Sequence, residues 1–75
     1  MEVHYVGKKA FRQRLAEFTY DDKEEDRFFA IANAMKVKGW NIDVGVQSWA
    51  AIEVVDRNEY EEVKSDWIDL KKAIK

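Results

Sequence analysis

Residues 55–74 have the pattern of one amphipathic helix, and this limits the folds open to the chain. Apolar residues recur there at spacings of three and four, which places them in one stripe along a helix. Asp56 is suited to cap the start, with Glu59 at the third helical position completing a capping box. Such a stripe must be buried, so the preceding residues must supply a surface for it. The stripe consists of Tyr60, Val63, Trp67, Leu70 and Ile74.

The first twenty residues predict two strands, the second with an alternative. Residues 2–6 are β-branched and aromatic and stop at Gly7, which favours an edge strand. Residues 10–20 fit both a helix and a strand. They end in Phe-Thr-Tyr and run directly into another helix start, so we favour a strand pairing with the first. The helix pattern depends on Phe11, Leu15 and Phe18, and the strand pattern on Ala16, Phe18 and Tyr20.

A second helix is predicted from about residue 22 to residue 38. Acidic residues gather at its start, where the helix dipole favours negative charge. Gly39 is the expected left-handed terminator. The face that we expect to be buried contains Phe28, Ile31, Ala32 and Met35.

Two further strands follow this helix. Residues 40–46 alternate with Trp40, Ile42, Val44 and Val46 on one face, and residues 50–55 form the return strand, joined through a hairpin connection at 47–49. The order is ββαββα, or βαββα if the first strand is only a tail. We therefore predict one α+β domain over residues 1–75: a single three- to four-stranded, mainly antiparallel sheet with both helices on one face.

The residue inventory argues against catalysis and cofactors. Histidine occurs once, at His4, and the chain has no cysteine. A nucleophile–base–orienter triad would therefore require a coincidence of the fold. No metal-ligand spacing and no glycine-rich phosphate loop is present, so we expect a protein that is not an enzyme and holds no metal or cofactor. No apolar run or signal peptide points to a membrane, and the absence of cysteine suits the cytoplasm.

Acidic residues predict a surface that binds a protein. One set falls on one flank of the apolar stripe of residues 55–74, and the second opens the helix of residues 22–38. The alternative is a surface that only keeps the protein soluble. In the functional interpretation, these carboxylates engage a basic groove of a partner protein by charge complementarity. The candidates are Glu59, Glu62, Asp66, Asp69, Asp21, Asp22 and Glu25.

Aromatic and basic residues supply two more candidate contacts. Trp49, at the hairpin connection, and Phe29, off the apolar face of its helix, are candidate interface anchors, and either could instead fold back over the core. A homodimer would also explain them. A basic cluster next to aromatic residues could hold single-stranded nucleic acid on an open sheet face, although a net charge of −2 argues against this partner. The cluster contains Lys8, Lys9, Arg12 and Arg14.

The chain resembles the short α+β proteins encoded by phages and other mobile elements. The resemblance is carried by Lys-Gly-Trp at residues 38–40 and by Asp-Arg-Asn-Glu-Tyr-Glu-Glu at residues 56–62. It covers about the C-terminal two-thirds of the sequence. It implies an accessory protein that binds a host protein, such as an inhibitor of bacterial defence. It transfers no functional residue, because that group has no shared site.

Overall fold

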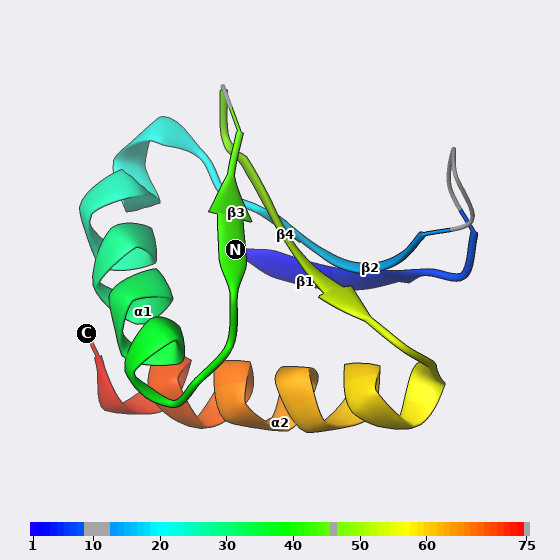
Figure 1. Ribbon diagram of the computed structural model, residues 1–75. Helices are drawn as coiled ribbons and strands as arrows, with labels where there is room; N and C mark the ends of the chain where they lie inside the picture. The colour runs from blue at the N-terminus through cyan, green and yellow to red at the C-terminus, as the bar shows by residue number, and fades with distance from the viewer. Residues whose placement is uncertain (9–12, 46, 75) are drawn as a thin grey trace.

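A computed structural model describes residues 1–8, 13–45 and 47–74, which form a four-stranded sheet and two α-helices (Figure 1). The predicted α+β class and the ββαββα order are confirmed. In chain order the elements are β1 (Glu2–Val6), β2 (Arg14–Thr19), the 3-10 helix η2 (Asp22–Glu24), α1 (Glu25–Val37), β3 (Ile42–Val44), β4 (Trp49–Val54) and α2 (Arg57–Ala73).

The strands lie in the order β1-β2-β4-β3, and each pairs antiparallel with its neighbour. Residues 14–19 are therefore strand, as we favoured, while residues 10–12 lie outside the described residues. Phe18 lies opposite Val3 on one side and Ala50 on the other. Ala16 has the same arrangement with Tyr5 and Ile52. Because side chains alternate along a strand, all of these residues share one face of the sheet.

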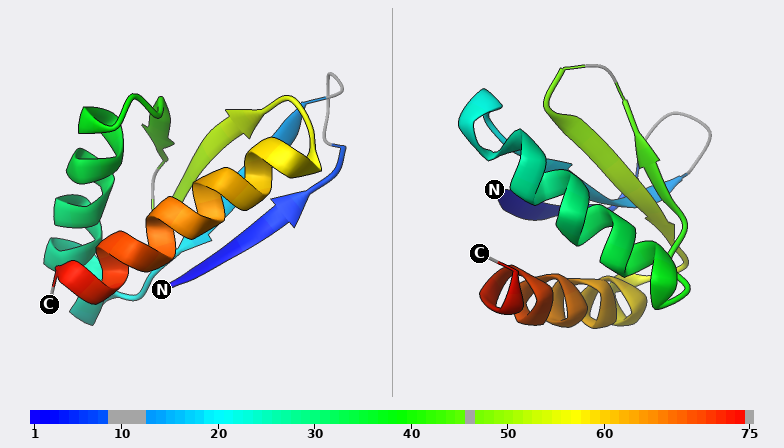
Figure 2. Two further views of the ribbon diagram at one scale, coloured as in Figure 1. Left: turned by 90° about the horizontal axis from the view of Figure 1, so that it is seen from below. Right: turned by 90° about the vertical axis from the view of Figure 1, so that its left-hand side faces the viewer.

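Both helices cover that face (Figure 2). The predicted stripe of α2 is confirmed, with Tyr60, Val63 and Trp67 buried. The Trp67 ring packs against Phe18 and Phe28, with ring centroids 4.4 and 5.6 Å apart. Leu70 and Ile74 of the stripe lie at the border of the same core, and the predicted face of α1 is buried in full at Phe28, Ile31, Ala32 and Met35.

The helix boundaries follow from local signals. The Asp56 carboxylate accepts a hydrogen bond from the backbone N–H of Glu59 at 2.9 Å, so the predicted N-cap is confirmed. Gly39 ends α1 with a positive φ of 107°. The start of α1 differs from the prediction, because residues 22–24 form the 3-10 turn η2 and the α-helix begins at Glu25.

β3 is shorter than the predicted strand of residues 40–46. The backbone N–H of Trp40 donates to the Met35 carbonyl at 3.1 Å, so this residue belongs to the end of α1 and not to the strand. Val46 lies outside the described residues. Gln47 and Ser48 have positive φ angles of 60° and 64°, which makes them the turn residues. Trp49, placed in the connection by the prediction, is the first residue of β4.

Candidate binding surfaces

The acidic flank of α2 divides into half-buried and exposed members. It consists of Glu59, Glu62, Asp66 and Asp69. Glu62 and Asp69 are exposed, whereas Glu59 and Asp66 are half-buried. Across residues 1–8, 13–45 and 47–74, the side-chain carboxylates of Glu62 and Asp69 take part in no hydrogen bond or ion pair. The solvent-facing part of this flank therefore consists of two unpaired carboxylates two helical turns apart, about 10 Å along the axis.

Asp66 has a structural role that its place on the acidic flank did not predict. Its Oδ2 accepts a hydrogen bond from the indole Nε1 of Trp40 at 2.7 Å. Its Oδ1 lies 3.6 Å from the ammonium of Lys38. Both partners follow α1, so Asp66 joins α2 to the end of α1. The Asp66 charge is therefore balanced within the protein by Lys38, and the place of Asp66 in the binding set stays a prediction.

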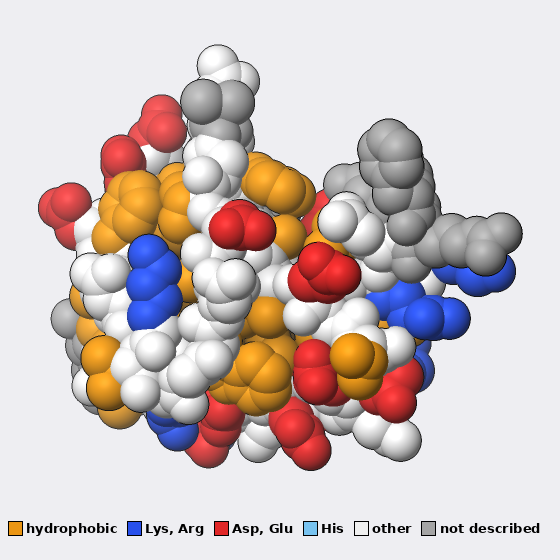
Figure 3. Space-filling view, viewed as in Figure 1, with side chains coloured by type: hydrophobic (Ala, Val, Ile, Leu, Met, Phe, Trp, Pro, Cys, Tyr) orange, Lys and Arg blue, Asp and Glu red, His pale blue; other side chains and the backbone are white. Residues whose placement is uncertain are grey.

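The second predicted acidic surface, Asp21, Asp22 and Glu25, is exposed at the beginning of α1. Figure 3 shows that acidic side chains at this point and those along α2 lie at opposite borders of one face of the molecule. They are two surfaces and not one. The neighbouring Glu24 is half-buried, and its carboxylate forms an ion pair with the N-terminal ammonium of Met1 at 3.0 Å.

The two candidate aromatic anchors both fold back onto the protein. Phe29 is half-buried, with its ring 5.7 Å from that of Phe28 and 6.1 Å from that of Tyr20. Trp49 lies on the sheet face opposite the helices, because its neighbour in β4, Ala50, faces the core. Its indole Nε1 donates to Glu17 at 3.2 Å. Neither aromatic side chain projects from the surface as a fully exposed anchor.

The described residues of the basic segment, Lys8 and Arg14, do not share an open face with their aromatic neighbours. Lys8 is exposed and Arg14 is half-buried, with its guanidinium donating to the Val55 carbonyl at 3.3 Å. Phe18, which shares the face of Arg14, is fully buried beneath the helices. Tyr20 is stacked on the core residue Phe28 with centroids 3.9 Å apart. Among the described residues, Lys8 and Arg14 therefore have no open face in common with Phe18 and Tyr20. Lys9 and Arg12 lie outside the described residues.

Sequence reasoning missed a pairing of cation and aromatic rings on α2. The Arg57 guanidinium lies 5.0 Å from the ring centroid of Tyr5 and 5.8 Å from that of Tyr60. These two rings also pack against each other, with their centroids 5.1 Å apart. The arrangement fixes the first turn of α2 against β1. Tyr5 is distant in sequence from Arg57 and Tyr60, so no local sequence pattern predicts this contact.

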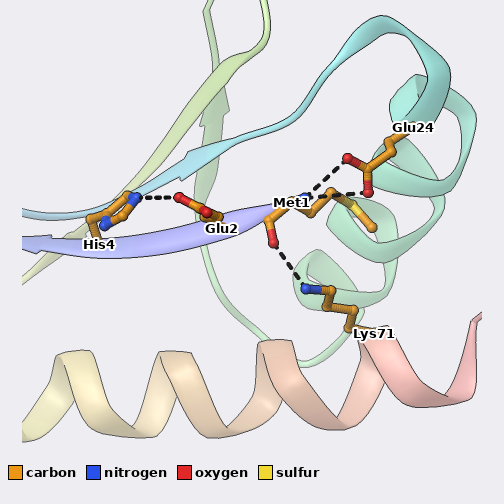
Figure 4. Close-up of polar contacts among 5 residues, drawn as sticks. All are labelled: Met1, Glu2, His4, Glu24 and Lys71. Atoms are coloured by element: carbon orange, nitrogen blue, oxygen red, sulfur yellow. Dashed lines mark hydrogen bonds and ion pairs between the residues drawn. The ribbon is translucent and has the colours of Figure 1, made fainter.

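The open face of the sheet is a third acidic surface that the sequence analysis did not identify. Among the described strand residues that point to this face, none is lysine or arginine. His4 on the edge strand lies 3.0 Å from the carboxylate of Glu2, as Figure 4 shows. The alternation of β-strand side chains is the signal that could have found this surface. Its carboxylates belong to Glu2, Glu17, Asp43 and Glu53.

Within the described part of the chain, no group of three or more histidine, cysteine or acidic side chains is arranged to hold a metal ion. No helix over those same residues is long and apolar enough to cross a membrane. Comparisons with models of protein families, with curated proteins and with solved structures found no match to this chain.

Proposed function

We propose that this chain is a cytoplasmic, non-enzymatic module that binds a basic surface of a partner protein through α2. The observation that supports this proposal is the pair of exposed carboxylates at Glu62 and Asp69, which no side chain in the described residues neutralises. Exposed carboxylates without an internal partner are available to a basic surface, whose charge is complementary to theirs.

The anchoring of α2 makes it suitable as a recognition element. Its stripe is buried, Asp56 caps its start, and Arg27 donates to the carbonyls of Lys71 and Ile74 at its end. The helix is therefore held along its whole length before a partner arrives. A preorganised element loses little conformational entropy on binding. Complementary charge also accelerates the encounter with a basic protein.

The resemblance to short phage-encoded proteins extends this proposal to the kind of partner. We propose a bacterial host protein, such as a component of a defence system, with a basic groove that normally holds nucleic acid. An acidic helix presents carboxylates to such a groove where the phosphates of a nucleic acid would lie. The Glu62–Asp69 surface is the part of the chain that would enter the groove.

A charge-reversal experiment tests the proposal. Tagged wild type and the double variant Glu62→Lys/Asp69→Lys are used to capture proteins from a bacterial lysate, with and without nuclease treatment. The recovered proteins are quantified by mass spectrometry. The control is Asp43→Lys/Glu53→Lys, which makes the same change of charge at exposed residues outside α2. Circular dichroism verifies that all three proteins fold.

We expect a partner that wild type and the control recover and that the α2 variant loses, with affinity reduced at least about tenfold. Its affinity for wild type should fall as salt rises, because exposed charges are screened. Equal recovery by the α2 variant would remove α2 from the interface. Recovery that collapses after nuclease treatment would instead favour nucleic acid and the segment of residues 8–14.

A further inference from the structure

A cavity of about 530 Å³ lies where the beginning of α1 meets the end of α2. Its lining, as far as the structure describes it, contains three cationic side chains and no carboxylate. This is opposite in sign to the chain as a whole, which carries a net charge of −2. Positive charge therefore gathers at this hollow. The lining residues are Arg27, Ile68, Lys71 and Lys72.

Arg27 is held in a fixed orientation at this cavity. Its Nε donates to the Ile74 carbonyl at 2.8 Å, and its Nη2 donates to the carbonyl of Lys71. These are carbonyls that the end of a helix leaves without partners. The guanidinium has five N–H groups, so three remain after these two hydrogen bonds. A rigid guanidinium with N–H groups to spare is suited to a carboxylate, which it binds in a two-pronged geometry.

The two lysines differ in their freedom to reach a ligand. The Lys71 ammonium donates to the Met1 carbonyl at 2.9 Å, so its charge is fixed beside the cavity (Figure 4). Lys72 is exposed and has no hydrogen-bond or ion-pair partner within the described residues. Its long side chain can therefore turn toward an anion in the hollow without breaking a contact.

The remaining wall is apolar. Ile68 is 37% exposed, so its side chain presents apolar surface at this cavity. The aliphatic stems of lysine side chains extend such an apolar surface. A ligand with a charged group at one end and a short hydrocarbon chain at the other would match both parts of the lining.

We propose that this cavity binds a small organic anion that carries a carboxylate and a short apolar chain. The carboxylate would lie at Arg27 with Lys72 closing over it, and the chain would cover Ile68. The volume falls in the range of small-molecule sites, about 300–1,000 Å³. The site is distinct from the Glu62–Asp69 surface in charge and in the flank of α2 that it uses.

The test is an NMR titration of the ¹⁵N-labelled protein with hexanoate, with hexanol and with inorganic phosphate, all at the same ionic strength. We expect saturable shifts with hexanoate, in the amides of residues 68–72 and in the Arg27 side chain. Hexanol lacks the charge and phosphate lacks the chain, so both should bind at least about tenfold more weakly. Phosphate or hexanol binding as tightly as hexanoate would overturn the proposed ligand class.

A matched pair of variants shows whether the shifts report this cavity. Lys72→Glu reverses a charge in the lining, and Lys36→Glu makes the same change at an exposed lysine of α1 outside it. We expect Lys72→Glu to weaken hexanoate binding at least about tenfold and Lys36→Glu to change it less than about twofold. Equal affinities of the two variants for hexanoate would overturn the site.

Discussion

At the scale of single residues, Gly45, which directly follows β3, shows how a side chain of β4 limits the residue opposite it in the hairpin. The indole of Trp49 lies over it: a Cβ built at Gly45 would meet Cε3 of that ring at 2.3 Å and Cζ3 at 2.9 Å. The Gly45 N–H also donates to the Trp49 carbonyl at 2.9 Å, so the two backbones cannot separate without losing a hydrogen bond. Glycine is required here by close approach.

We predict that Gly45→Ala destabilises the protein by about 1–3 kcal/mol, because the added methyl group must displace a rigid ring. Gly7→Ala is the control, since its Cβ would meet Cε2 of Tyr5 at an ordinary contact distance of 3.5 Å. That change should alter stability by less than about 1 kcal/mol. Urea denaturation followed by circular dichroism measures both. Equal effects of the two changes would show that the indole moves aside at little cost.

At the scale of elements, the start of α2 depends on an N-cap residue that can be recognised from the sequence alone. The Asp56 carboxylate satisfies the backbone N–H of Glu59, one of the donors that a helix start leaves without a partner. We predict that Asp56→Ala lowers the free energy of unfolding by about 1 kcal/mol. Asp56→Ser should retain most of the stability that the Asp56 cap supplies, since serine is also a strong N-cap. Thermal unfolding of the three proteins decides this, and a loss as large with serine as with alanine would point to charge and not to capping.

The elements that sequence predicts well are those with local signals. The N-cap and the apolar stripe of α2 lie within a few residues of the structure that they control. The same holds for Gly39, which ends α1. The extent of β3 could not be predicted in this way. Trp40 continues the strand alternation in sequence, yet its N–H is bound to the end of α1 and its indole to Asp66. Those contacts depend on where α2 packs. The alternation of apolar residues in the sequence gives no information about that packing.

The same reasoning explains how much of the candidate site was predictable. Helical spacing placed the acidic flank on one side of α2, and Glu62 and Asp69 are exposed there. It could not separate these two from Asp66, because the partner of Asp66 lies 26 residues away. The cavity at Arg27 was not predicted for a similar reason. Its lining comes from two helices whose ends meet only after folding.

At the scale of the whole molecule, Tyr60 connects α2 to the edge strand β1. It is buried, and its hydroxyl donates to the Val3 carbonyl at 3.4 Å. Burial raises the pKa of Tyr60 above its usual value of 10.0; the Glu61 carboxylate acts in the same direction, and the Arg57 guanidinium opposes both. The folded protein therefore retains the phenol proton at a pH where the unfolded chain has lost it.

We predict a loss of stability at alkaline pH that Tyr60→Phe reduces. The contribution of Tyr60 is complete below pH 10 and is lost as the pH rises through the higher pKa of the folded state. At pH 7 the variant should lose no more than about 1 kcal/mol, since the hydrogen bond to Val3 is long. Urea midpoints of both proteins from pH 8 to pH 11 give the slopes. Identical slopes would exclude Tyr60 as the titrating group.

The strand order has a consequence for synthesis of the chain on the ribosome. β2 lies inside the sheet, but the strand that covers its second edge, β4, is made about thirty residues later. Until residues 49–54 emerge, the hairpin of β1 and β2 has one edge unpaired. Such an edge is a template for association between chains. The nascent protein is thus most vulnerable to aggregation in the interval between β2 and β4, a vulnerability that vanishes when β4 takes its place in the sheet.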